Sequence, residues 1–420
     1  MTAVVDTTDI SAPARTAGAV SFATTGLPTQ KLEDWRFTPL GDLATATFTV
    51  APAATVEAAA LAPYLFGHDE WTRLVFVNGR YAGALSRLAP LPEGVTVTTT
   101  AEAIHAGHPL VQAKLGTIAV PETTPFTALN ARDFTDGFVV HVPKGVHVET
   151  PIHVVFVTTA EAAGTAVSTR SLIVLEREAR ASIIENHITL AGDATYFANN
   201  VTEVSVATHS WLEHCRLQRE SEAAYHMGAT VVTQEPESHY RSFSLAMGGK
   251  LARHDLKLHL NGADCEALFY GLYLAHGQQL VDNHTTIHHD HPNCRSWQVY
   301  KGVLDDRARG VFNGKIFVKP EAQKTDAKQT NRAVLLSETA KIDTKPQLEI
   351  FADDVKCTHG ATVGFLDDSM RYYLRSRGIG GDQAKRMLTY AFCAEVVAEV
   401  AIQPVREALD ALVRERCGVA

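Results

Sequence analysis

The sequence predicts a mainly β protein, with a parallel β-helix core between a small mixed N-terminal domain and a C-terminal helical domain. From about residue 138 to residue 350, short β-branched runs of roughly four to eight residues follow one another, and helical periodicity is nearly absent. Similar segments recur within this stretch roughly every 25 to 31 residues, a spacing typical of stacked coils. After residue 364 the periodicity becomes helical.

The N-terminal part divides into two predicted regions. Residues 1–20 are rich in Thr, Ala and Ser and lack a period, which predicts a mobile tail. Residues 21–125 should form a mixed helical and strand domain. They contain a short amphipathic segment at 31–40 and an Asn-Gly turn between two apolar runs at 74–81, the usual signal of a hairpin.

Residues 126–364 are predicted to form the β-helix. A propeller needs longer, four-stranded blades, and a sandwich shows evenly spaced turns without a long repeat; an irregular β-sandwich is the alternative. The repeated segments begin at Ala179, Ser210, Ser238, Ala263 and Asn293. Because side chains alternate along a strand, apolar residues at every second position should fill the interior, and those we expect there are Ile183, Leu212, Phe243, Leu268 and Val299.

Residues 365–420 are predicted to form the helical domain. Its three helices are expected at 367–377, 382–402 and 404–417. The first has acidic residues in its first turn and basic residues in its last, which complements the helix dipole. The second is apolar over more than one face, with Met387 and Phe392 among its apolar residues. This breadth predicts burial against a partner, or equally a helix lying on its own β-core.

Composition excludes several classes of protein. The net charge of -9, from 38 basic and 47 acidic residues among 420, lacks the basic bias of a nucleic-acid or anionic-membrane binder. The six cysteines lie far apart, which argues against a disulfide-stapled secreted protein. No basic and apolar leader and no apolar window of about 18 residues is present. We therefore expect a cytoplasmic protein with reduced thiols that binds neither nucleic acid nor membrane.

Cys357 and His359 are the candidate metal ligands. They stand two positions apart beside Asp353 and Asp354, where the β pattern gives way to helices. In an extended segment both side chains point to the same face, and a thiolate with an imidazole can hold a metal. The alternative is a buried cysteine followed by a turn histidine near Gly360.

Other polar clusters favour structural roles. His284, His288, His289, His291 and Cys294 match no closed zinc motif, and a strand would turn His288 away from its neighbours. The carboxylate pairs Asp305-Asp306, Asp353-Asp354 and Asp367-Asp368 could serve a polysaccharide-active β-helix enzyme. However, adjacent strand residues point apart, and the last pair resembles a helix cap. No glycine-rich segment has the spacing of a phosphate-binding loop.

Several segments together closely resemble the SufB/SufD family of iron-sulfur cluster assembly proteins. The resemblance covers most of the chain, and the form of residues 349–364, Glu-Ile-Phe-Ala-Asp-Asp-Val-Lys-Cys-Thr-His-Gly-Ala-Thr-Val-Gly, is similar to the SufD type. The other matching segments are Glu33-Asp-Trp-Arg36, Ala128-Leu-Asn-Ala131, His141-Val-Pro-Lys-Gly145, Tyr300-Lys-Gly-Val-Leu304, Lys324-Thr-Asp-Ala-Lys-Gln-Thr-Asn331 and Tyr373-Leu-Arg-Ser-Arg-Gly-Ile379.

The resemblance implies a right-handed β-helix in a complex of SufB, SufD and two copies of the ATPase SufC. The late β-helix coils would pair with a SufB-like chain, and residues 367–417 would dock the ATPase, with Met387 and Phe392 at that contact. His359 and the neighbouring Cys357 would face a SufB cysteine where a transient iron-sulfur cluster forms, with no cofactor bound permanently. The chain itself would be a non-catalytic scaffold, or alternatively a structural adaptor that never contacts iron.

Overall fold

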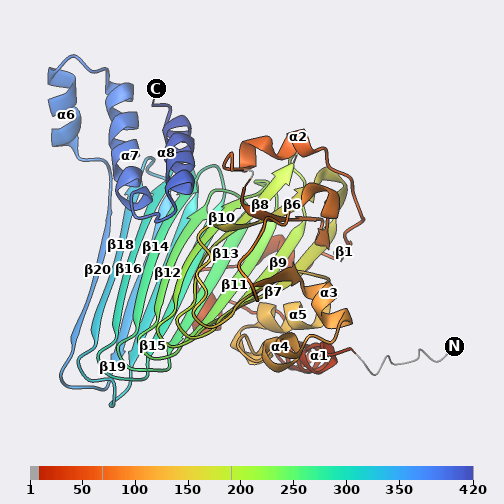
Figure 1. The fold of residues 1–420 in the computed structure, drawn as a ribbon. Helices are drawn as coiled ribbons and strands as arrows, with labels where there is room; N and C mark the ends of the chain where they lie inside the picture. Colours follow the sequence, from red (N-terminus) through yellow and green to blue (C-terminus); the bar gives the residue numbers. More distant parts are fainter. Residues whose placement is uncertain (1–8, 69, 191, 420) are drawn as a thin grey trace.

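The computed structural model describes residues 9–68, 70–190 and 192–419. Two ten-stranded sheets face each other and form an elongated solenoid, with helices at both ends of the chain (Figure 1). Through the core the chain alternates between the sheets, so that each strand pairs in parallel with the strand two places away in sequence. The predicted parallel β-helix is confirmed.

We call the two sheets sheet A and sheet B. From its C-terminal edge, sheet A consists of β19 (Lys341–Ile350), β17 (Arg309–Val318), β15 (Leu280–His289), β13 (Leu251–Leu260), β11 (Tyr225–Gln234), β9 (Phe197–Val206), β7 (Thr165–Leu175), β5 (Phe138–Val142) and β4 (Thr96–Thr99), with β1 (Thr49–Val50) paired to β7. Sheet B consists of β20 (Lys356–Gly364), β18 (Asp326–Leu335), β16 (Arg295–Leu304), β14 (Glu266–Ala275), β12 (His239–Ala246), β10 (Trp211–Arg219), β8 (Arg180–Leu190), β6 (Ile152–Thr159), β2 (Thr72–Val77) and β3 (Arg80–Tyr81).

A left-handed corner residue explains the repeat in the sequence. Two residues before each strand of sheet B from β8 to β18, a non-glycine residue takes a φ between 57° and 64°. This conformation turns the chain sharply and is tolerated best by Asn and Asp. The corner residues are Glu178, His209, Glu237, Asp264, Asn293 and Lys324. The first five adjoin or coincide with the predicted starts of the repeated segments, and Lys324 extends the series by one coil.

The interior between the sheets contains only part of the predicted core. Ile183 and Leu212 belong to the interior apolar cluster, as predicted. The prediction is wrong for Phe243, Leu268 and Val299, which pack on the opposite face of sheet B beneath the C-terminal helices. The reason is register: Leu212 stacks in line with Tyr240, Ala267 and Ser296, so the three misplaced residues occupy the other set of alternating positions.

The predicted mobile tail is wrong for residues 12–20. These residues begin helix α1 (Ala12–Thr25), which packs against α5 (Pro125–Asp133). A Cβ on the buried Gly18 would come within 2.8 Å of Ala131 Cβ. The helix is therefore held by close packing at a glycine and not by a stripe of apolar side chains. Residues 1–8 of the predicted tail lie outside the described residues. The other short helices of this part of the chain are α2 (Ala58–Leu61), α3 (Thr100–His105) and α4 (Pro109–Lys114).

The predicted hairpin at 74–81 is confirmed, and it belongs to the solenoid. Strands β2 and β3 pair in antiparallel fashion around Asn78 and Gly79, both of which have positive φ. Strand β2 then pairs in parallel with β6, while β4 and β1 join sheet A. The strands of the N-terminal region therefore extend both sheets.

The C-terminal helices α6 (Asp368–Ser376), α7 (Gly381–Val397) and α8 (Gln403–Cys417) agree with the expected number and order. Helix α7 ends five residues before the predicted end at 402. It lies on β14 and β16 at the C-terminal end of the solenoid (Figure 1). There it buries Cys393, Val396 and Val397 against sheet B. None of the helices in the described ranges is both long and apolar enough to cross a membrane.

A buried ion pair attaches the N-terminal helical region to sheet A. Arg170, on β7, donates from Nε to Glu203 Oε1 at 2.8 Å, and its two other nitrogens donate to Asn130 Oδ1 at 3.2 Å and the Ala119 carbonyl at 2.6 Å. Glu203, on β9, also accepts backbone N–H groups from residues 116, 118 and 119 at 2.7 to 2.9 Å. Both side chains are fully buried, and each is well supplied with partners, as a buried charge requires.

Replacing Glu203 with Gln should lower the free energy of unfolding by about 3–5 kcal/mol, because the substitution leaves the buried Arg170 guanidinium without its counter-charge. Urea denaturation measures the change. Asp133→Asn is the matched control, since Asp133 pairs with Arg132 at the surface, where an ion pair contributes about 0–1 kcal/mol. Equal losses in the two variants would contradict the assignment.

Candidate functional site

Cys357 and His359 lie on β20, the last strand of sheet B. Cys357 pairs in register with Ala327 of β18, and His359 pairs with Gln329. Ala327 and Gln329 are both buried between the sheets, so the two candidate ligands project from the interior side of the strand. The prediction that they share a face is confirmed. Residues two apart on a strand are separated by about 7 Å, close enough for both to contact one small cluster.

The two side chains differ in exposure. Cys357 is half-buried against an apolar cluster that includes Ile316, Val318 and Ala352. Burial raises the pKa of its thiol, and the negative charge of Asp326 adds to this effect. At neutral pH the free thiol therefore keeps its proton, and binding of a metal would release it. His359 is exposed at the end of the solenoid.

The ligand set around this pair is small. Within the described ranges, no three or more His, Cys, Asp or Glu side chains are grouped so that they could hold a metal ion. Asp353 is exposed, and Asp354 forms an ion pair with Lys324. The Cys357 and His359 pair can therefore supply at most part of a metal site, and further ligands would have to come from outside the described residues.

The histidine-rich segment separates into unrelated environments. His284 contacts buried Asp282 at 3.1 Å, and His288 stacks on His259 with ring centroids 4.3 Å apart. His289 lies between the sheets and interacts with Ser296 Oγ at 2.8 Å, while the Cys294 thiol donates to the Gly262 carbonyl at 3.2 Å. These contacts support the structural roles favoured by the sequence. Asp367 accepts the Ser369 N–H at 2.8 Å, which confirms that this carboxylate caps α6.

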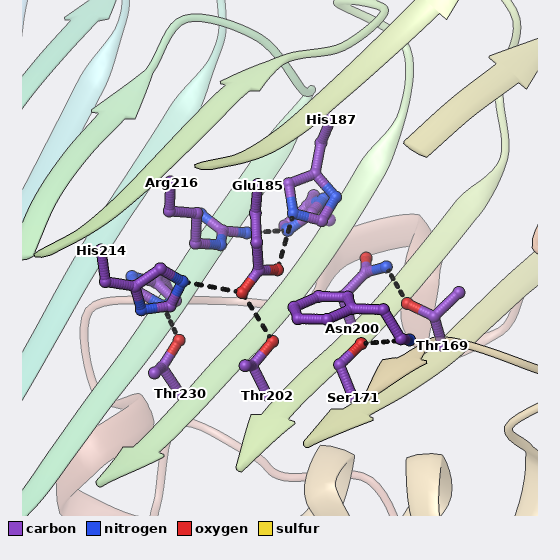
Figure 2. A network of polar contacts seen from close by, with 12 residues as sticks. Thr169, Ser171, Glu185, His187, Asn200, Thr202, His214, Arg216 and Thr230 are labelled. Carbon is purple, nitrogen blue, oxygen red and sulfur yellow. Dashed lines mark hydrogen bonds and ion pairs between the residues drawn. The ribbon is translucent and has the colours of Figure 1, made fainter. Parts of the chain in front are cut away.

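A polar network inside the solenoid was missed by the sequence analysis. Glu185 lies between the sheets and contacts Nε2 of His214 at 2.9 Å, accepts from Thr202 Oγ1 at 2.9 Å and faces His187 at 3.6 Å (Figure 2). Although burial opposes ionisation, the two imidazoles hold the pKa of Glu185 well below its usual range. Further along the interior, Arg216 interacts with His226.

The alternation of the strands does contain a signal for this network. Glu185 and His187 continue the inward positions that begin at Ile183, and His214 continues those of Leu212. We predicted an apolar interior, and so we did not assign the polar residues at inward positions to the core. Their partners lie on neighbouring strands 17 to 29 residues away in sequence, so the pairing itself depends on the stacking register.

The two predicted partner-binding residues of α7 have different environments. Met387 is half-buried. Phe392 packs on the solenoid: Lys301 Nζ lies 4.5 Å from its ring centroid and donates to its carbonyl at 2.9 Å. Met370, Tyr372 and Tyr373 of α6 are more exposed, at 56–74%. A groove of about 350 Å³ between α6 and α7 is lined by Ser369, Met370, Tyr373, Leu374 and Leu388.

Family comparisons agree with this architecture. Residues 156–392 match the family described as the SufBD core domain of SUF system FeS cluster assembly, and residues 6–154 match the SufBD protein N-terminal region. The chain belongs to the SufBD family. Within that family it is of the SufD type.

Three relatives of this SufBD chain illustrate the similarity. The iron-sulfur cluster assembly protein SufD of Escherichia coli is 33% identical over 398 residues, covering 93% of this chain and 90% of that protein. A SufBD family protein of Synechocystis is 34% identical over 382 residues, covering 89% and 84%. SufD of Bacillus subtilis is 29% identical over 299 residues, covering 69% and 66%.

The buried imidazoles of this SufBD chain should make its stability depend on pH. Burial lowers the pKa of His153 and His289 to about 3 and that of His226 to about 4. Well above pH 6.5, these groups are neutral in both the folded and the unfolded chain. As the pH falls from about 6.5 toward 4.5, only the unfolded chain takes up their protons, so the free energy of unfolding decreases by about 4 kcal/mol per pH unit near pH 5. Urea denaturation at several pH values measures the slope.

His153→Phe provides the matched comparison. Among the described residues Nε2 of His153 has no hydrogen-bond partner, and the ring packs on Phe66, so a phenyl ring preserves the packing without leaving a polar group unpaired. The slope should fall by about 1.4 kcal/mol per pH unit. A stability that is flat between pH 6.5 and 4.5 would contradict the assignment of these buried histidines as neutral.

Proposed function

We propose that this chain is the SufD-type subunit of a SUF scaffold complex, in which it pairs with a SufB-like chain and presents His359 to a nascent iron-sulfur cluster. The observation that carries the proposal is the position of Cys357 and His359. They share one face of the last strand, at the end of the solenoid where the described coils stop. The names of the relatives, iron-sulfur cluster assembly proteins, supply the class of cargo.

The last coil is suited to pairing with another β-helix. Among the described strands, β19 has a neighbour only in β17, and β20 only in β18, so both sheets end in an open edge. Unpaired N–H and C=O groups along such an edge can be continued by strands of a second chain. Several large apolar side chains are exposed at the ends of these strands, which adds apolar area to the contact: Ile350, Phe351, Val363 and Phe365.

An incomplete ligand set agrees with a shared site. Iron-sulfur clusters are usually held by four protein ligands, most of them thiolates, and this chain offers one thiol and one imidazole on β20. The SufB-like partner would supply the remaining thiolates. A single imidazole ligand would also make the cluster easier to release than four thiolates would, which suits a scaffold that transfers its cargo. The chain itself would catalyse no reaction.

The C-terminal helices provide the proposed contact with a SufC-type ATPase. The exposed Met370, Tyr372 and Tyr373 and the groove beside α7 form an apolar surface for such a partner. Helix α7 rests on β14 and β16, and each strand of sheet B is bonded to the next as far as β20. When ATP binding closes the ATPase pair, the movement could therefore be transmitted to the cluster site through α7 and sheet B.

A structural adaptor that never contacts iron is the second candidate function. It is favoured by the protonated state of the Cys357 thiol and by the exposure of His359 in the chain alone. The two functions differ in one measurable respect. Only a scaffold that binds the cluster needs the imidazole of His359, whereas an adaptor needs only its contact surfaces.

His359→Ala should strongly reduce the iron and sulfide that co-purify with the assembled complex, because it removes a ligand. Assembly should be unchanged, since His359 is exposed and exposed substitutions usually change stability by less than about 0.5 kcal/mol. Iron and sulfide assays on the co-expressed subunits, with size-exclusion chromatography, provide the measurement. Thr358→Ala, on the opposite face of β20, is the matched control. Unchanged iron and sulfide in His359→Ala would favour the adaptor.

Tyr373→Glu should weaken binding of the ATPase subunit roughly 30-fold, the effect of losing an interface hot spot of about 2 kcal/mol. Isothermal titration calorimetry measures the affinity. Tyr81→Glu introduces the same charge at an exposed tyrosine on β3, at the opposite edge of sheet B, and should leave binding unchanged. Phe392→Ala should instead lower the stability of the chain, because Phe392 packs on the solenoid. Normal affinity in Tyr373→Glu would contradict docking on α6.

A further inference from the structure

One stacked column of interior side chains leads to His359. In register, His359 pairs with Gln329 of β18, and Gln329 pairs with Gln298 of β16. Adjacent strands lie about 4.8 Å apart, so residues in register have neighbouring side chains on the same face. Gln329 and Gln298 are each 1% exposed. The candidate ligand is therefore the outermost member of the column, and a buried carboxamide lies directly beneath it.

The two carboxamides differ in their hydrogen bonds. Gln298 Oε1 accepts from Thr285 Oγ1 at 2.6 Å, and only its Nε2 has no partner among the described residues. For Gln329, neither Oε1 nor Nε2 has a hydrogen-bond partner among the described residues. Buried polar groups are nearly always paired, and an unpaired one is costly. The Gln329 carboxamide is thus a buried donor and acceptor that forms no hydrogen bond with the described residues.

The space occupied by the Gln329 carboxamide is provided by the facing sheet. Gly314 lies opposite on β17, and a Cβ at that position would stand 1.8 Å from Gln329 Nε2. A side chain of any kind at residue 314 would therefore displace the carboxamide. The two positions together place an amide below the open end of the solenoid, where purely apolar packing would have been the simpler solution.

We propose that Gln329 is the positioning residue for His359: its carboxamide oxygen accepts the N–H of one imidazole nitrogen and leaves the other nitrogen free for iron. This inference rests on the proposed function of His359. Histidines that ligate metals usually donate their second ring N–H to a carbonyl or carboxylate, which fixes the tautomer and the ring orientation. Gln329 Oε1 is an acceptor of this kind on the adjacent strand, β18.

The tautomer of His359 in the full-length chain tests the inference without iron. Long-range ¹⁵N–¹H correlation spectra of histidine-labelled protein at pH 8 report which ring nitrogen carries the proton, and loss of a signal in His359→Ala assigns it. Gln329→Met keeps the size of the side chain but removes the acceptor, so it should change the tautomer ratio roughly fivefold, as loss of an ordinary hydrogen bond would. Gln329→Glu retains an acceptor and should keep the wild-type preference.

Gln298→Met is the matched control, because it makes the same change on the next strand of the stack, β16, where the amide oxygen accepts from Thr285. It should leave the His359 tautomer ratio unchanged. Thermal unfolding confirms that each variant is folded. An unchanged ratio in Gln329→Met, or an equal change in Gln298→Met, would overturn the inference. Failure of the proposed function would appear separately, as normal iron and sulfide content in His359→Ala, whatever the tautomer spectra show.

Discussion

The in-register stacking of parallel strands is the constraint on which the rest of the structure depends. Because each residue lies above the residue at the same position of the previous coil, the choice of inward and outward positions in one strand fixes the choice in its neighbours. The same rule places the apolar interior, the outer face that α7 covers and the column that ends at His359. A site built on such a strand has its orientation set by the whole stack.

Stacking also explains why the interior can hold so many polar groups. Glu185, His214 and Arg216 lie where neighbouring coils can supply partners at fixed distances, so a buried polar network forms. Such a network satisfies its members only when every coil is in place. Specific coil order is thereby favoured over slipped alternatives, at the cost of sensitivity to protonation.

Much of the fold and the shared face of Cys357 and His359 followed from the sequence, because both depend on the local period of two along each strand and on similar segments that recur along the core. Which of the two alternating sets of side chains faces the interior did not follow from the sequence. Phe243, Leu268 and Val299 look like interior residues, but they pack beneath the C-terminal helices. Helix α1 was missed because Gly18 packs by close approach to Ala131, and the partners of Glu185 were missed because they arise only when the coils stack.

The open edges of β19 and β20 have a consequence for the life of the chain in a cell. Two exposed edge strands, one in each sheet, with apolar side chains beside them can pair with strands of other chains, including those of a second copy. A subunit produced in excess of its partner would carry these edges uncovered and would tend to aggregate or be degraded. Balanced synthesis of the subunits would then be a requirement imposed by the same edges through which we propose that the chain assembles.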